Sequence, residues 1–164
     1  MDLFILRHGK AGKSSGEPDD DTRALTREGK EEIKRVARWM KVKKFRFDII
    51  ATSPLQRARE TAEIVAAVLG QKNRIALWDD LAPGGDPHTV CYNASQQGTD
   101  AAVLIVGHEP ALSMLISKIV WGDGNGSIMV SKGGLAKIRN FSFDTRPSGD
   151  LQWLLTPKQI LEMG

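Results

Sequence analysis

The sequence predicts an α/β fold, a three-layer sandwich in which a mostly parallel sheet carries helices on both faces. Short apolar runs that suit buried strands alternate along the chain with segments whose apolar residues recur at helical spacing. The length of 164 residues suits one domain, and we expect it to span residues 1–164. A mostly parallel sheet follows because helices connect successive strands.

Six segments have the length and composition of strands, being short, apolar and bounded by Gly, Pro or charged residues. They lie at residues 3–6, 47–51, 74–78, 101–106, 135–143 and 151–155. A turn around Pro147, Ser148 and Gly149 joins the last two, which predicts an antiparallel pair at one edge of the sheet.

Four helices are expected between the strands. Their start signals are Thr26, Ser53, Asp86 and Pro110. The second helix has the fullest signal, because a proline follows Ser53, Gln56 can complete a capping box, and Gly70 suits a left-handed stop after Leu69. A segment rich in Gly, Ser, Asp and Lys at residues 9–22 predicts an exposed loop.

Composition excludes several classes of protein. Lys and Arg number 23 against 20 Asp and Glu, a net charge of +3 with no basic block, so we expect no nucleic-acid partner. The single cysteine, Cys91, excludes an internal disulfide, and we expect it to be a buried helix residue. The first residues lack the features of a signal peptide, and no apolar stretch approaches the roughly 20 residues that span a bilayer. We expect a cytoplasmic monomer with no membrane partner.

Three strand ends carry residues that suit an anion. Arg7 and His8 follow the first strand, Arg57 lies one turn into the next helix, and His108 follows the strand at 101–106. Taken singly, each also fits an ordinary solvated strand end. Because ligands bind beyond the carboxyl ends of parallel strands, however, the sheet should bring all four together. Guanidinium groups match phosphate oxygens, helix N-termini favour anions, and a neutral imidazole is a nucleophile. The pattern therefore predicts a phosphate site.

The ordered motifs resemble those of the histidine phosphatase superfamily, which has the phosphoglycerate mutase-like fold. They are FILRHG at residues 4–9, SPLQRARETA at 53–62 and VGHEP at 106–110. Within the superfamily the chain is most similar to the compact SixA-type phosphohistidine phosphatases, on its small size and on the segments LTREG at 25–29 and LAPGGD at 81–86.

The resemblance implies a two-step phosphoryl transfer. His8 would attack phosphorus and form a phosphohistidine that water then hydrolyses, while Arg7, Arg57 and His108 hold the phosphoryl oxygens. It implies no metal or other cofactor. The implied substrate is a phosphohistidine-bearing protein of signalling or phosphotransfer.

Larger relatives have a carboxylic acid after the third strand that protonates an ester leaving group. Asp80 falls nearest that place, with Asp86 as the alternative, and either could instead be a surface loop residue or a helix cap. Two other functions stay open, an enzyme of the same superfamily acting on small phosphoesters (a phosphomonoesterase or phosphomutase) and a non-catalytic phosphoprotein-binding module.

Overall fold

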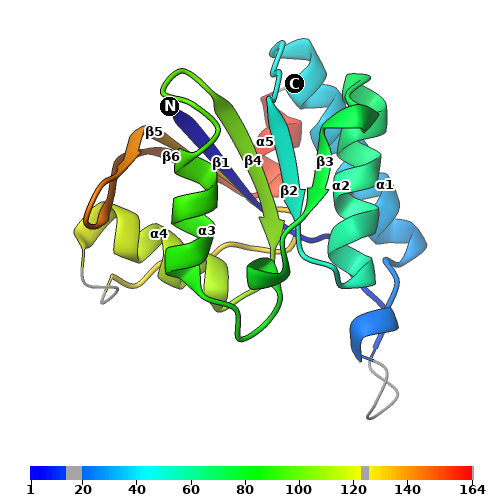
Figure 1. Ribbon diagram of the computed structural model, residues 1–164. Coiled ribbons are helices and arrows are strands. Elements are labelled where there is room, and N and C mark those ends of the chain that lie inside the picture. Colours follow the sequence, from blue (N-terminus) through cyan, green and yellow to red (C-terminus); the bar gives the residue numbers. More distant parts are fainter. Residues whose placement is uncertain (14–19, 123–125, 164) are drawn as a thin grey trace.

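The computed structural model describes residues 1–13, 20–122 and 126–163, and shows one six-stranded sheet with helices on both faces (Figure 1). The strands are β1 (Asp2–Arg7), β2 (Ile49–Thr52), β3 (Ile75–Leu77), β4 (Ala102–Gly107), β5 (Leu135–Phe143) and β6 (Pro147–Leu155). The helices are α1 (Arg27–Val42), α2 (Gln56–Leu69), α3 (Pro87–Ser95), α4 (Ala111–Trp121) and α5 (Pro157–Glu162), with short 3-10 helices η1 (Asp20–Thr22), η2 (Lys72–Arg74) and η3 (Asp79–Leu81). The predicted fold class is confirmed.

The strand order β3-β2-β4-β1-β5-β6 separates a parallel part of the sheet from an antiparallel edge. β1 to β4 run parallel, whereas β5 pairs antiparallel with both β1 and β6. Arg7 lies opposite Gly107, and Thr52 lies opposite Val106. The ends of β1, β2 and β4 are therefore level, so the residues that follow them share one edge of the sheet.

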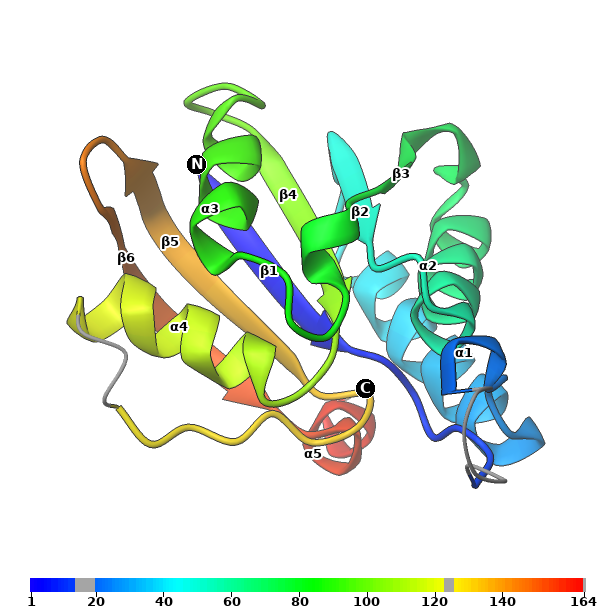
Figure 2. The same ribbon diagram turned by 60° about the horizontal axis from the view of Figure 1, so that its bottom comes forward.

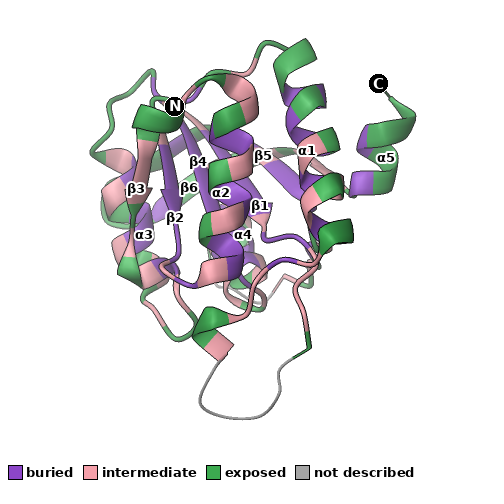
Figure 3. Cartoon of the chain, turned by 90° about the vertical axis from the view of Figure 1, so that its right-hand side faces the viewer, coloured by how far each residue is buried: buried purple, intermediate pink, exposed green. Residues whose placement is uncertain are grey.

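Two apolar layers fix the sheet between its helices (Figures 1 and 2). On one face α1, α2 and α5 pack through residues such as Ile33, Val65 and Ile160. On the other face α3 and α4 pack through residues such as Cys91 and Ile116, and Cys91 is buried as expected. Figure 3 shows the buried strands enclosed by helices whose outer sides are exposed. None of the described helices is long and apolar enough to cross a membrane.

The start of α2 differs from the expectation. The helix begins at Gln56 with Leu55 as its N-cap, and no side chain caps it. Ser53 instead accepts a hydrogen bond from the Leu55 amide within the preceding turn, so the expected capping box is wrong. The proline after Ser53 delays the helix, and the Ser53 hydroxyl becomes available to the site described below.

The C-terminal region also differs. The turn expected at residues 147–149 is wrong, because Pro147 begins β6 and pairs with Phe143. A proline is tolerated there since the first residue of an edge strand needs no amide donor. Helix α5 was not expected, although Thr156 and Gln159 form a full capping box with a proline between them. Of the loop expected at residues 9–22, residues 14–19 lie outside the described chain.

Candidate active site

The four residues predicted from the strand ends lie around one cavity of about 340 Å³. Its lining is Arg7, His8, Ala11, Asp20, Arg23, Arg57, Pro83, His108, Glu109 and Lys132. The rings of His8 and His108, 100 positions apart in the sequence, have centroids separated by 5.0 Å. We call this cavity the phosphate pocket. The sheet thus brings the predicted residues together, as the strand-end argument requires.

The His8 ring is oriented by a hydrogen bond to the backbone. Its Nδ1 lies 2.7 Å from the carbonyl oxygen of Gly9, and because a carbonyl only accepts, Nδ1 carries the proton. The lone pair is then on Nε2. Burial is the main cause that lowers the pKa of His8 to about 4; the positive charges of Arg57 and Arg7 add to it, and the hydrogen bond to Gly9 opposes it. His8 is therefore neutral near pH 7, and its Nε2 has the lone pair that a nucleophile needs.

His108 packs against the His8 ring and is held by Ser53. Its Nε2 lies 2.8 Å from the Ser53 hydroxyl, the group freed from the cap of α2. Burial is the main cause that lowers the pKa of His108 to about 3, and His8 and Arg57 add to it. Its Nδ1 is buried with no hydrogen-bond partner in the described part of the chain.

Arg57 is fixed by Asp20, which lies in η1. The guanidinium donates through Nη1 to the Asp20 carbonyl oxygen at 2.7 Å and through Nη2 to the carboxylate Oδ2 at 3.0 Å. The other carboxylate oxygen pairs with Arg23 at 3.2 Å. One carboxylate therefore aligns two guanidinium groups on the phosphate pocket. Asp20 and Arg23 were missed because they lie in a loop without periodicity, where only their charge distinguishes them.

Arg7 is held from the opposite side. Its Nη1 donates to the carbonyl oxygen of Val130 at 2.9 Å, and the amide of Val130 donates to the Glu109 carboxylate at 2.8 Å. That carboxylate also accepts from the amide and hydroxyl of Ser113. Burial lowers the pKa of Arg7, an effect that the negative charge of Glu109 opposes. Glu109 thus anchors the segment on which Arg7 rests.

Thr61 joins the segment that carries His8 to α2. Its buried hydroxyl accepts a hydrogen bond from the Gly9 amide at 3.1 Å and donates to the Arg57 carbonyl oxygen at 2.7 Å. The sequence signal was the threonine of the second motif, four positions after Arg57, to which no role was assigned.

The two candidate acids lie outside the phosphate pocket, although Asp80 lines an adjacent cavity. Asp86 caps α3 by accepting from the amides of His88 and Thr89. Asp80 accepts from the amide of Asp86 at 3.1 Å. Neither lines the phosphate pocket, where the carboxylates among the described residues are those of Asp20 and Glu109.

The pocket has the chemistry of a phosphoryl-transfer site. Three guanidinium groups and Lys132 face a cavity that also contains a neutral imidazole with a free lone pair. The Nε atoms of Arg7, Arg23 and Arg57 are buried and make no hydrogen bond to any described residue, so each is a donor left unpaired beside the cavity. In residues 1–13, 20–122 and 126–163 no group of three His, Cys, Asp or Glu side chains is placed to hold a metal ion.

Comparison with known proteins agrees with this chemistry. The sequence profile of the histidine phosphatase superfamily (branch 1) matches residues 3–82. The chain is 31% identical to a protein of Picosynechococcus sp., over 98% of this chain and 99% of that protein. It is 28% identical to the phosphohistidine phosphatase SixA of Escherichia coli, over 96% and 94% of the two chains. A solved structure of the protein histidine phosphatase SixA with tungstate superposes with a TM-score of 0.82 at 27% identity, over 96% of this chain and 98% of that one. The chain belongs to the histidine phosphatase superfamily and is a phosphatase.

Proposed function

We propose that this phosphatase removes the phosphoryl group from phosphohistidine in a protein, through a covalent intermediate on His8 and without a metal ion. The observation that carries the proposal is the state of His8, a neutral ring whose Nδ1 is tied to the Gly9 carbonyl beside two fixed arginines. The similar E. coli protein is named a phosphohistidine phosphatase, which supports the substrate class.

In the first step the Nε2 lone pair of His8 attacks phosphorus in line with the leaving group. The P–N bond of the substrate breaks as the new P–N bond forms, and its electron pair stays on the leaving imidazole, which takes a proton from water. Arg7, Arg57 and His108 donate to the phosphoryl oxygens, whose charge is spread over them in the transition state.

In the second step water attacks the phosphorylated His8. The bond between phosphorus and Nε2 breaks, its electrons return to the ring as the lone pair, and the water proton leaves with solvent. Inorganic phosphate departs, and the hydrogen bond from Nδ1 to Gly9 keeps the ring in the same orientation for the next cycle.

The carboxylates at the pocket favour a phosphoramidate over an ester. Asp20 is engaged by Arg57 and Arg23, and Glu109 accepts from Val130 and Ser113. Each is therefore committed as an acceptor and is poorly suited to donate a proton. An alkoxide leaving group needs such a donor, whereas an imidazole nitrogen is readily protonated by water.

The test is a comparison of substrates in the presence of EDTA. A histidine-phosphorylated phosphotransfer protein and a simple phosphate ester are offered separately, and release of inorganic phosphate is measured. We expect turnover of the phosphohistidine to exceed that of the ester by at least tenfold. Preference for the ester would identify a small-molecule phosphomonoesterase, and phosphoprotein binding without turnover of either would identify a binding module.

A further inference from the structure

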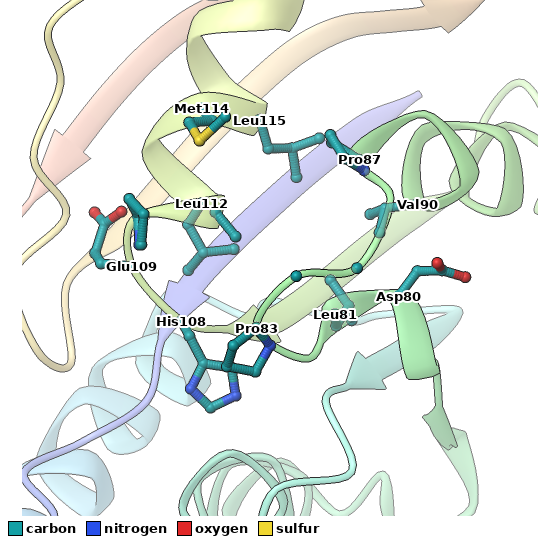
Figure 4. A pocket seen from close by; sticks show the side chains of 14 residues that line it. Asp80, Leu81, Pro83, Pro87, Val90, His108, Glu109, Leu112, Met114 and Leu115 are labelled. Atoms are coloured by element: carbon teal, nitrogen blue, oxygen red, sulfur yellow. The ribbon is translucent and has the colours of Figure 1, made fainter.

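A second cavity, of about 280 Å³, lies beside the phosphate pocket between α4 and the turn from η3 to α3 (Figure 4). We call it the apolar cavity. Its walls are mainly aliphatic side chains and prolines, namely Leu81, Pro83, Pro87, Val90, Leu112, Met114 and Leu115. This composition predicts favourable contact with an apolar group, since burying apolar surface is the dominant gain in such a site.

The carboxylates at the edge of the apolar cavity do not face its aliphatic walls (Figure 4). Figure 4 shows the carboxylates of Asp80 and Glu109 pointing away from the aliphatic walls. Asp80 accepts from the amide of Asp86, and Glu109 accepts from Val130 and Ser113. Both carboxylates are therefore satisfied within the chain, and the interior surface is left apolar.

The two cavities are adjacent, and residues at the edge of the apolar cavity are exposed to solvent. Pro83, His108 and Glu109 line both of them. At the mouth Pro83 and Gly84 are exposed, and the Met114 side chain is 55% exposed. A group in the apolar cavity therefore lies within a side chain's reach of a phosphoryl group bound at His108, and it can enter from outside.

We propose that the apolar cavity is a specificity subsite that receives an apolar side chain of a residue next to the phosphohistidine in the substrate protein. The proposal rests on the proposed function. The occupant belongs to the substrate because the apolar cavity shares Pro83, His108 and Glu109 with the phosphate pocket, so it lies next to the place where a phosphohistidine would bind. The volume, just below the roughly 300–1,000 Å³ of small-molecule pockets, suits one side chain.

The test uses three phosphohistidine substrates. Two are peptides that differ only in the residues on both sides of the phosphohistidine, leucine in one and serine in the other. The third is phosphorylated N-acetylhistidine, which has no neighbour. For the wild-type protein we expect kcat/KM to be about tenfold or more higher for the leucine peptide than for the serine peptide, the discrimination typical of a hydrophobic pocket.

Two matched variants locate the preference. Met114→Glu places a charge at the mouth of the apolar cavity and should abolish the preference while turnover of phosphorylated N-acetylhistidine stays within twofold of wild type. Met129→Glu makes the same exchange at a residue that is 81% exposed and does not line the cavity, so it should retain the preference.

Equal kcat/KM for the two peptides in the wild-type protein, or an unchanged preference in Met114→Glu, would overturn the subsite and leave the proposed function standing. Failure of all three phosphohistidine substrates, with a phosphate ester turned over in parallel, would overturn the proposed function and the subsite with it.

Discussion

The phosphate pocket and the apolar cavity share a wall yet are built on opposite physical principles. The first gathers arginines and two histidines that lose hydration on burial, and the pKa values of His8 and His108 are lowered to about 4 and about 3 as a result. The second is walled by side chains such as Leu112 and Leu115, each 2% exposed, whose burial stabilises the fold. The residues proposed to act in catalysis therefore differ from the neighbouring residues whose burial stabilises the fold.

This difference is sharpest at the nucleophile. His8→Ala should abolish turnover and the trapped phosphoenzyme, because no other described residue offers a free imidazole lone pair at the same place. The free energy of unfolding should not fall by more than about 1 kcal/mol, since the variant removes a ring that is costly to bury. Phosphate release and denaturant unfolding measure the two effects. His88→Ala, an exposed histidine of α3, is the matched control and should keep full activity. Turnover retained by His8→Ala would contradict the nucleophile assignment.

Arg57→Ala should lower kcat/KM by about 10²–10³, the loss that follows removal of one fixed donor to a developing oxyanion. The reason is that Arg57 is 3% exposed and aligned on the phosphate pocket by Asp20. Arg59→Ala removes an exposed arginine from the same helix and should change the rate less than twofold. A loss below tenfold in Arg57→Ala would place that guanidinium outside the transition state.

Leu112→Ala, in the apolar cavity, should have the opposite effect to the two preceding variants: it should lower stability and leave the rate nearly unchanged. Truncation of a fully buried leucine leaves a void and costs about 2–5 kcal/mol of unfolding free energy. Turnover of phosphorylated N-acetylhistidine at low temperature should stay within about threefold of wild type, because the charged groups are anchored elsewhere. Chemical denaturation checks the first effect and steady-state kinetics the second. A large loss of rate without a loss of stability would contradict the view that the apolar cavity contributes to stability and the phosphate pocket to catalysis.

Glu109 lines both cavities, and substituting it tests whether it supports Arg7 through Val130. Glu109→Ala should lower kcat about tenfold by releasing Val130, whose carbonyl holds Arg7, whereas Glu109→Gln should recover most of the rate because an amide oxygen still accepts from Val130. The split between kcat and KM is the measurement. If Glu109 acted only through its charge, both variants would lower KM equally and leave kcat unchanged.

A further effect is expected on the pH dependence of stability. Unfolded histidine binds a proton below about pH 6.5, but folded His8 and His108 do so only near pH 4 and 3. Between these limits the unfolded state binds more protons, so stability falls as pH falls from 6.5. His8→Asn should reduce the loss between pH 7 and pH 5 by about 2 kcal/mol, as measured by urea unfolding at each pH. Identical pH slopes in the variant and the wild type would show that His8 is not held neutral by the fold.

The sequence predicted the phosphate pocket more fully than its surroundings, and the reason is geometric. Arg7 ends β1, and His8 and His108 directly follow β1 and β4, so the parallel sheet alone places them at one edge. Asp20 reaches Arg57 from a position 37 residues away, in a loop that no periodicity marks. Tertiary contact of this kind has no local signature.

The same limit explains the missed features of the fold. Ser53 is a residue type that commonly caps helices, but its hydroxyl instead makes a hydrogen bond with His108, which lies 55 positions away in the sequence. Pro147 resembles a turn residue and instead opens an edge strand. Leu112 and Leu115 have the spacing of a helix core, and only the structure shows that they also line a cavity beside the phosphate pocket. Local sequence patterns therefore predict a helix or strand, but they do not predict which distant residues will contact it.

The central position of β1 in the sheet bears on how the protein should lose activity on heating. This strand hydrogen-bonds to β4 on one side and β5 on the other, and Leu3, Ile5 and Leu6 within it are fully buried. Amide protons of such a central strand exchange only when the cooperative unit opens as a whole, whereas edge strands such as β3 fray locally. Because His8 directly follows β1, we expect inactivation by heat to coincide with global unfolding rather than with loosening of the edge strands.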